Sequence, residues 1–276
     1  AKATDEYILK GGESETFEPH FTFHGFRFVK LEQFPGTPDI HTITGMVIHT
    51  DMPPAGSFVC SDSLINQLQQ NIQWGQKGNF LDVPTDCPQR DERLGWTGDA
   101  QVFAPTAAFN FNVAPFFTKW MLDLAADQLP DGKVTDVVPD VRSGRGSSTA
   151  WGDAAWVVPW TLYEAYGDTT ILETQYLSMK SWVEYMHQRA GNKNLWIGDD
   201  HYGDWLAYAS TRSDYPGATT EEDLIATAYY AYSTNRLAQI ATILGKTEDA
   251  GKYEKLAEKI KEAFIREFVT PAGRLV

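Results

Sequence analysis

The sequence predicts a mainly α-helical protein: a partial (α/α)6 toroid of helical hairpins, preceded by the end of a β-sandwich domain. From residue 58 onwards, apolar residues recur with the helical period in about seven segments. The segment 224–244 is apolar or small nearly all round, whereas 247–268 is amphipathic. Alternation of buried and half-exposed helices is what two concentric layers of hairpins require.

Residues 1–57 are predicted to be the C-terminal part of a β-sandwich domain. Aromatic and polar residues alternate with period two through 19–29, a second such run covers 41–49, and turn residues bound both. About three or four strands are too few to bury both faces of a sandwich, so we expect the tail of a larger domain. The linker is predicted at Asp51–Ser57, and residues 58–276 are predicted to be the N-terminal part of the toroid domain.

The predicted helices follow start and stop signals. The first begins behind the capping residues Ser61 and Ser63 and carries Leu64 and Leu68 on one face. Residues 219–222, Thr-Thr-Glu-Glu, have the pattern of a capping box at the start of another helix. The remaining boundaries give helices at 99–111, 113–128, 151–166, 171–189, 219–245 and 247–268.

Composition excludes several classes of function. The net charge of −14 argues against a nucleic-acid partner, because phosphate backbones are bound by clustered Lys and Arg. No apolar run reaches the roughly 18 residues of a membrane span, so no membrane insertion is expected. Cys60 and Cys87 are interpreted as two separate thiols. Neither has a CxxC partner, and for His20 and His24 packing in a sheet is favoured over ligation, so neither a metal nor a cofactor is expected.

The strongest candidate for chemistry is the segment 83–99, Val-Pro-Thr-Asp-Cys-Pro-Gln-Arg-Asp-Glu-Arg-Leu-Gly-Trp-Thr-Gly-Asp, which we call the acid loop. Carboxylates beside arginine and beside an indole occupy different environments, so their pKa values can separate into a proton donor and an ionised partner. Glu92 is the candidate general acid, and Trp96 and Leu94 are predicted to form an apolar wall that raises its pKa.

Two simpler interpretations of the acid loop stay open. Asp91 and Glu92 can pair with Arg90 and Arg93 on a solvated turn, where such pairs contribute little energy. Asp99 is either an acid at the start of a helix, favoured by the helix dipole, or a member of the site.

Three further segments, 138–142, 151–153 and 203–205, also place an acid beside Trp or Arg. Sugars present apolar C–H faces and many hydroxyls, so their binding sites combine aromatic rings with carboxylates. The tryptophans close to Gly and Asp are candidates for sugar contact: Trp96, Trp151 and Trp205. Those inside predicted helices are expected in the core: Trp120, Trp156, Trp160 and Trp182.

Residues 86–99 resemble the signature of the bacterial-type α-L-rhamnosidases, and residues 19–29 resemble the end of the β-sandwich that precedes their catalytic domain. That family has an (α/α)6 toroid and inverting chemistry. The resemblance implies release of terminal α-L-rhamnose from rhamnose-containing oligosaccharides, polysaccharides or glycosides. It implies three catalytic carboxylates, with Glu92 as general acid, Asp99 as a supporting acid and Asp86 as the third. It implies substrate contacts from Asp86, Arg90, Trp96, Asp140, Trp151, Asp153, Asp204 and Trp205.

Inversion requires a second carboxylate roughly 6.5–9.5 Å from the acid, with room for the attacking water. In this family the base is a glutamate in the second half of the toroid, so we expect it past the end of this chain and expect the isolated chain to have little or no activity. Two alternatives remain. One is a toroid hydrolase acting on another sugar, such as a uronide; the other is a non-catalytic carbohydrate-binding or structural fragment.

Overall fold

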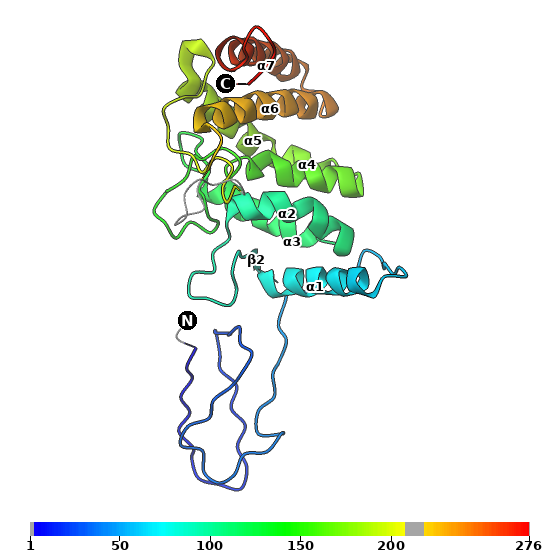
Figure 1. Ribbon diagram of the computed structural model, residues 1–276, viewed down its shortest axis with the longest axis vertical. Helices are drawn as coiled ribbons and strands as arrows, with labels where there is room; N and C mark the ends of the chain where they lie inside the picture. Colours follow the sequence, from blue (N-terminus) through cyan, green and yellow to red (C-terminus); the bar gives the residue numbers. More distant parts are fainter. Residues whose placement is uncertain (1–2, 208–217, 276) are drawn as a thin grey trace.

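The computed structural model describes residues 3–207 and 218–275, which form a stack of α-helices, as predicted (Figure 1). The helices are α1 (Ser63–Asn79), α2 (Thr97–Asn110), α3 (Ala114–Asp127), α4 (Ala154–Tyr166), α5 (Thr170–Ala190), α6 (Glu222–Ile243) and α7 (Thr247–Phe268). Short turns join α2 to α3, α4 to α5 and α6 to α7, and within the last two of these pairs the helices pack against each other. One short antiparallel pair, β1 (Phe80–Leu81) and β2 (Val83–Pro84), follows α1, and a 3-10 turn, Gly191–Lys193, follows α5.

The helices differ in how completely they are covered. Helix α6 contacts α4, α5 and α7, which explains why its sequence is apolar or small nearly all round. Helix α7 packs along α6 through one apolar face and leaves its Lys/Glu face to solvent. Of the tryptophans predicted to be core, Trp120, Trp156 and Trp182 are fully buried and Trp160 is partly buried against the same cluster.

One buried carboxylate connects three of these helices. Asp153, immediately before α4, has no exposed surface. Its Oδ1 accepts hydrogen bonds from the indole N–H groups of Trp156 and Trp182, both at 3.1 Å, and from the hydroxyl of Ser233. Its Oδ2 accepts from the backbone N–H of Ala150 at 2.7 Å. Because a buried carboxylate is tolerated only when its lone pairs are taken up, Asp153 fixes α4, α5 and α6 relative to one another.

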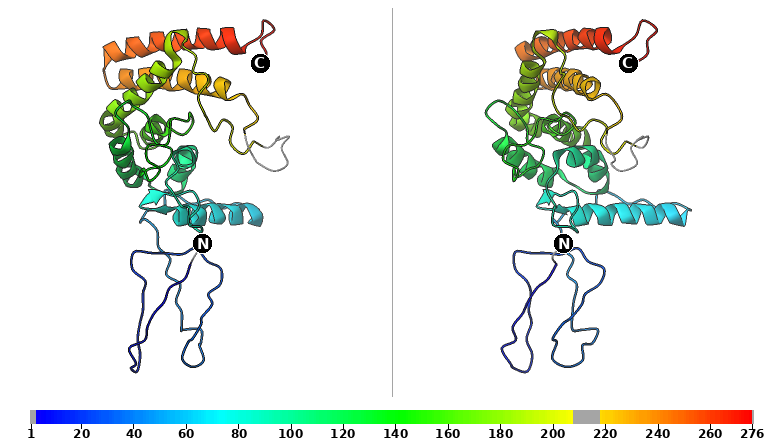
Figure 2. Two further views of the ribbon diagram at one scale, coloured as in Figure 1. Left: turned by 90° about the vertical axis from the view of Figure 1, so that its left-hand side faces the viewer. Right: turned by 60° about the vertical axis from the view of Figure 1, so that its left-hand side comes forward.

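The N-terminal segment differs from the strands predicted for it. No strand is assigned to residues 19–29 or 41–49 within the described residues. A strand is stabilised by a hydrogen-bonded neighbour and by burial of one face. Here the backbones form no ladder within the described residues, and Phe21, Phe26 and Phe28 are exposed. Figure 2 shows this segment projecting from the α1 end of the stack.

The start of α1 also corrects a prediction. The N-cap is Asp62, whose Oδ1 accepts from the backbone N–H of Leu64 at 2.8 Å, and neither Ser61 nor Ser63 has this role. The Asp62 carboxylate satisfies the same first-turn N–H donors that a serine hydroxyl would. Leu64 and Leu68, predicted on the apolar face, are 79% and 56% exposed, respectively.

Two further helix starts lie later than predicted. Helix α4 begins at Ala154, because residues 149–153 form turns that place Asp153 under the core indoles. Helix α6 begins at Glu222, and no capping box forms: Glu221 makes no side-chain cap bond, while the Glu222 carboxylate accepts from the backbone N–H of His201 at 3.2 Å. In the described residues, no helix combines the length and hydropathy needed to cross a membrane.

We expect Asp153→Ala to lower the free energy of unfolding by at least about 3 kcal/mol. The substitution leaves three buried donors, on Trp156, Trp182 and Ser233, without an acceptor, and each such group costs about 1–3 kcal/mol. Urea denaturation of the protein that carries this chain measures the change. The exposed Asp200 provides a control, since Asp200→Ala is expected to stay within about 0.5 kcal/mol. Equal stabilities for the two variants would refute the anchoring role.

Candidate active site

The acid loop folds around Asp86. The backbone N–H of Asp86 donates to the carbonyl of Leu94 at 3.0 Å, and Oδ1 of Asp86 accepts the N–H of Leu94 at 3.1 Å. Oδ2 of Asp86 accepts from Arg90 Nη2 at 2.8 Å, and the side chain is only 9% exposed. Asp86 therefore closes the loop across eight residues and fixes the position of Arg90.

Glu92 is more accessible than Asp86, with 40% of its side chain exposed. Its Oε1 accepts from the indole Nε1–H of Trp96 at 2.8 Å, and its Oε2 forms an ion pair with Arg90. The predicted wall was apolar; instead, Trp96 turns its polar edge towards the carboxylate. Glu92 thus has a fixed position through two donors while remaining open to solvent.

Asp99 belongs to the same electrostatic cluster. It lies in the first turn of α2, as the helix-start interpretation predicted, and the residue is exposed overall. Partial burial of the carboxyl group, followed by the negative charge of Asp86, raises the pKa of Asp99, with Glu92 adding to the effect. The structure therefore brings together the three carboxylates predicted to be catalytic: Asp86, Glu92 and Asp99.

Close backbone contacts hold the acid loop against its neighbours. The N–H of Val138 donates to the carbonyl of Gly95 at 2.8 Å, and a Cβ on Gly95 would lie 2.1 Å from the carbonyl oxygen of Val138. Only glycine fits at that position. On the other side, Arg93 Nη1 donates to the carbonyl of Phe23 at 2.8 Å and its guanidinium lies 4.2 Å from the centre of that ring. The loop is therefore held between the helical stack and the N-terminal segment.

Aromatic rings lie beside the acids. The ring of Trp151 packs on Gly98, where a Cβ would come within 2.5 Å of it. The ring of Tyr202 lies 4.5 Å from Trp151, 6.3 Å from Trp96 and 5.8 Å from Trp205, centre to centre. The three tryptophans predicted to contact sugar thus gather around Tyr202, a residue that the sequence interpretation missed.

Asp140 and Asp153, both predicted to bind substrate, have their oxygens engaged within the protein. Asp140 accepts the backbone N–H of Arg142 at 2.9 Å and that of Gly144 at 2.6 Å, which closes a turn. Asp153 is the buried core anchor described above. The structure therefore places neither carboxylate free within the cluster of acids and rings.

Asp204 clamps the connection to α6. Its carboxylate accepts the backbone N–H of Thr219 at 2.7 Å and that of Thr220 at 3.1 Å, together with both threonine hydroxyls at 3.0 and 2.8 Å. Burial opposes ionisation, but these hydrogen bonds outweigh it and lower the pKa of Asp204 to about 2. Asp204 therefore positions its neighbour Trp205 rather than presenting a free carboxylate.

Sequence reasoning missed three residues behind the acid loop: Asp136, Arg142 and Tyr202. Asp136 is buried and accepts from the Tyr202 hydroxyl at 2.9 Å. The guanidinium of Arg142 lies 4.8 Å from the centre of the Trp96 ring. Arg142 lies within the segment 138–142 and Tyr202 immediately precedes 203–205, two segments that place an acid beside Arg or Trp. Their position in or next to these segments is the sequence feature that could have indicated them.

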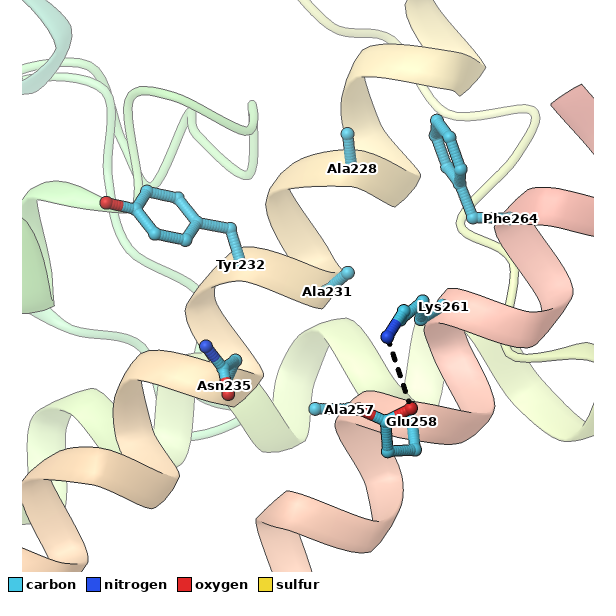
Figure 3. A pocket seen from close by; sticks show the side chains of 8 residues that line it. All are labelled: Ala228, Ala231, Tyr232, Asn235, Ala257, Glu258, Lys261 and Phe264. Carbon is cyan, nitrogen blue, oxygen red and sulfur yellow. Dashed lines mark hydrogen bonds and ion pairs between the residues drawn. The ribbon is translucent and has the colours of Figure 1, made fainter. Parts of the chain in front are cut away.

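Outside this site, a groove lies between α6 and α7 (Figure 3). Small side chains, Ala228, Ala231 and Ala257, form its floor, and Lys261 reaches Glu258 across one side at 3.5 Å. The groove shares no residue with the acid loop. In the part of the chain that the structure describes, no group of three or more His, Cys, Asp or Glu residues has the arrangement of a metal site.

The chain is thus a helical-hairpin domain whose acid loop places carboxylates beside a group of indoles. The model of the bacterial alpha-L-rhamnosidase six-hairpin glycosidase domain matches residues 53–276, and that of the bacterial alpha-L-rhamnosidase concanavalin-like domain matches residues 1–49. The chain therefore belongs to the bacterial α-L-rhamnosidase family.

Similar proteins agree with this assignment. An α-L-rhamnosidase of Streptomyces avermitilis is 46% identical to this chain over its whole length, and the match covers 26% of that protein. An α-L-rhamnosidase of Formosa agariphila is 42% identical over 97% of this chain, and the match covers 29% of that protein. The chain thus spans about a quarter of the length of these relatives. The crystal structure of the S. avermitilis α-L-rhamnosidase complexed with L-rhamnose superimposes with a TM-score of 0.86 and covers 97% of this chain and 25% of that chain. The crystal structure of the Aspergillus terreus α-L-rhamnosidase is 39% identical and superimposes with a TM-score of 0.77, covering 82% of this chain and 26% of that chain.

Asp204→Ala is expected to destabilise the protein by about 1 kcal/mol at pH 7, because the start of α6 loses its acceptor. The folded-state pKa of about 2 lies below the ordinary value of 3.8, so the stabilisation is present above about pH 4 and is lost as the pH falls towards 2. Unfolding of both proteins at pH 7 and pH 3 measures this. The difference in free energy of unfolding between the native protein and Asp204→Ala should shrink at pH 3. Glu221→Ala, a substitution of an exposed carboxylate just before α6, is the control, and its stability should stay within about 0.5 kcal/mol of the native value at both pH values.

Proposed function

We propose that the protein containing this chain hydrolyses terminal, non-reducing α-L-rhamnose residues from rhamnosides, with inversion at the anomeric carbon. The observation that carries the proposal is the arrangement of the acid loop: a half-exposed Glu92 held by Trp96, with Asp86 and Asp99 beside it. The bound L-rhamnose in the S. avermitilis relative supports the choice of sugar.

In this proposal Glu92 is the general acid. It transfers its proton to the glycosidic oxygen as the bond to the anomeric carbon breaks, so that the aglycone leaves as a neutral alcohol. The carboxylate that remains is stabilised by donors already in place, the Trp96 indole N–H at 2.8 Å and the Arg90 guanidinium. Because these groups are fixed before the reaction, they need no reorganisation when the charge develops.

The neighbouring residues are proposed to hold the sugar ring. Asp86 and Arg90 offer an acceptor and a donor set for hydroxyls, and the indoles of Trp96, Trp151 and Trp205 offer apolar surface to the C–H faces. The raised pKa of Asp99 extends the pH range over which it keeps its proton, so it can donate as well as accept a hydrogen bond.

We propose that three carboxylates support the sugar site without contacting the sugar: Asp140, Asp153 and Asp204. Each carboxylate binds groups of the protein and so fixes a loop that carries a ring or a cation near the acids. Asp204 adjoins Trp205, and Asp153 follows the turn that contains Trp151. This changes their proposed role from substrate contact to support of the residues that touch the substrate.

The general base completes the mechanism. An inverting hydrolase needs a carboxylate on the opposite face of the sugar, roughly 6.5–9.5 Å from the acid, to activate the attacking water. We assign this base to the part of the relatives' fold that this chain does not span, because the chain corresponds to about a quarter of their length. The proposal therefore concerns the whole protein.

Glu92→Gln in the full-length protein should lower kcat towards an aryl α-L-rhamnoside with a poor leaving group by about 100-fold to 10,000-fold, the usual contribution of a general acid. A rhamnoside with a strongly acidic phenol as leaving group needs little protonation and should lose much less. Steady-state kinetics on both substrates measures the contrast.

Asp91→Asn is the matched control, since Asp91 is an exposed carboxylate next to Glu92, and its kinetics should stay near those of the native protein. Equal losses of Glu92→Gln on both substrates would remove Glu92 from the role of acid. A panel of aryl glycosides extends the test to the sugar. Turnover of a uronide in place of the rhamnoside would overturn the substrate, and sugar binding without turnover by the full-length protein would overturn the activity.

A further inference from the structure

A buried carboxylate behind the acid loop holds two groups that both touch Trp96. Asp136 lies between α3 and α4 and is 3% exposed. Its Oδ2 accepts from the hydroxyl of Tyr202 at 2.9 Å and lies 3.8 Å from Nη1 of Arg142. Burial raises the pKa of Asp136, while Tyr202 and Arg142 act in the opposite direction by stabilising its ionised form.

Arg142 and Tyr202 both pack on the Trp96 ring. The guanidinium carbon of Arg142 is 4.8 Å from the ring centre, within the range of a cation–π contact. The Tyr202 ring meets it nearly edge-on, at 74° and 6.3 Å. Asp140 keeps Arg142 in place by accepting its backbone N–H at 2.9 Å. Trp96 is therefore in contact with a cation and a ring that are both held by Asp136.

The orientation of this indole matters because its single N–H points to Glu92. A rotation of the ring breaks the 2.8 Å bond from Nε1 to Glu92 Oε1, and Trp has no second donor with which to replace it. Arg142 does not touch Glu92 in the contacts of the described residues, so its influence on the carboxyl passes through Trp96.

We propose that Arg142, anchored by Asp136 and Tyr202, is a positioning residue that holds the Trp96 indole with its N–H on the Glu92 carboxyl. The inference rests on the proposed function, in which Glu92 is the general acid. Arg142 also neutralises the buried Asp136, which is a purely structural contribution. The two roles differ in one measurable respect: only loss of position at the acid makes the damage depend on the leaving group.

The test compares Arg142→Met with the native full-length protein on two aryl α-L-rhamnosides, one with a poor and one with a good leaving group. Loss of orientation at Glu92 should lower kcat about 10-fold or more on the poor leaving group, a fraction of the general-acid contribution, and less than about 3-fold on the good one. KM can rise as well, because Trp96 is also proposed to contact the sugar, so the dependence of kcat on the leaving group is the diagnostic readout.

Three further variants keep the outcome interpretable. Arg145→Met removes the same charge from an exposed position three residues away and should leave both rates near native. Arg142→Lys keeps the charge but loses the planar guanidinium, so its losses should fall between those of the native protein and Arg142→Met. Tyr202→Phe keeps the ring and removes the hydroxyl from Asp136, which should give a smaller loss with the same dependence on leaving group.

Equal losses on both substrates in Arg142→Met and Tyr202→Phe, or a change confined to KM, would overturn the positioning role. Melting temperatures of all variants separate a general loss of stability from a local one. Glu92→Gln distinguishes the two proposals. If it lacks the leaving-group dependence, the proposed function fails; if it shows that dependence and the Arg142 and Tyr202 variants do not, this inference alone fails.

Discussion

The burial of one carboxylate is the constraint on which the rest of the helical stack depends. Asp153 lies in an apolar interior where an unsatisfied charge would be prohibitive, and its donors come from residues 29 and 80 positions away as well as from its own turn. The three helices must therefore adopt one relative placement for the charge to be satisfied. The same turn carries Trp151, whose ring rests on Gly98 at the start of α2, so the constraint in the core extends to the acid loop.

Around that scaffold, the acids of the loop are distinguished by their surroundings rather than by their type. Asp86 is nearly buried, and its two oxygens accept hydrogen bonds from an arginine and from a backbone amide, so its position is fixed. Glu92 keeps exposed surface and has an indole donor as its defined partner on one oxygen. Asp99 is affected by the charge of both. Acid–base roles in hydrolases arise from such differences between neighbouring carboxylates.

The helices could be predicted because each presents a long periodic pattern, and 247–268 was placed to the residue. The strands of the N-terminal segment could not be confirmed locally, since alternation in a sequence does not supply a neighbouring strand. An acid beside a tryptophan was interpreted as a sugar ligand at Asp153 and Asp204, yet the same pair serves a core anchor and a loop clamp. The partners that distinguish these roles lie 15 to 80 residues away, where no local pattern reaches.

The clamp at Asp204 has a consequence for how the rings and the helices are coupled. Its bonds join the residue next to Trp205 to Thr219 and Thr220, which lie immediately before α6. The ring of Trp205 in turn lies 5.8 Å from that of Tyr202, centre to centre. The rings beside the acid loop therefore cannot shift without straining the start of α6.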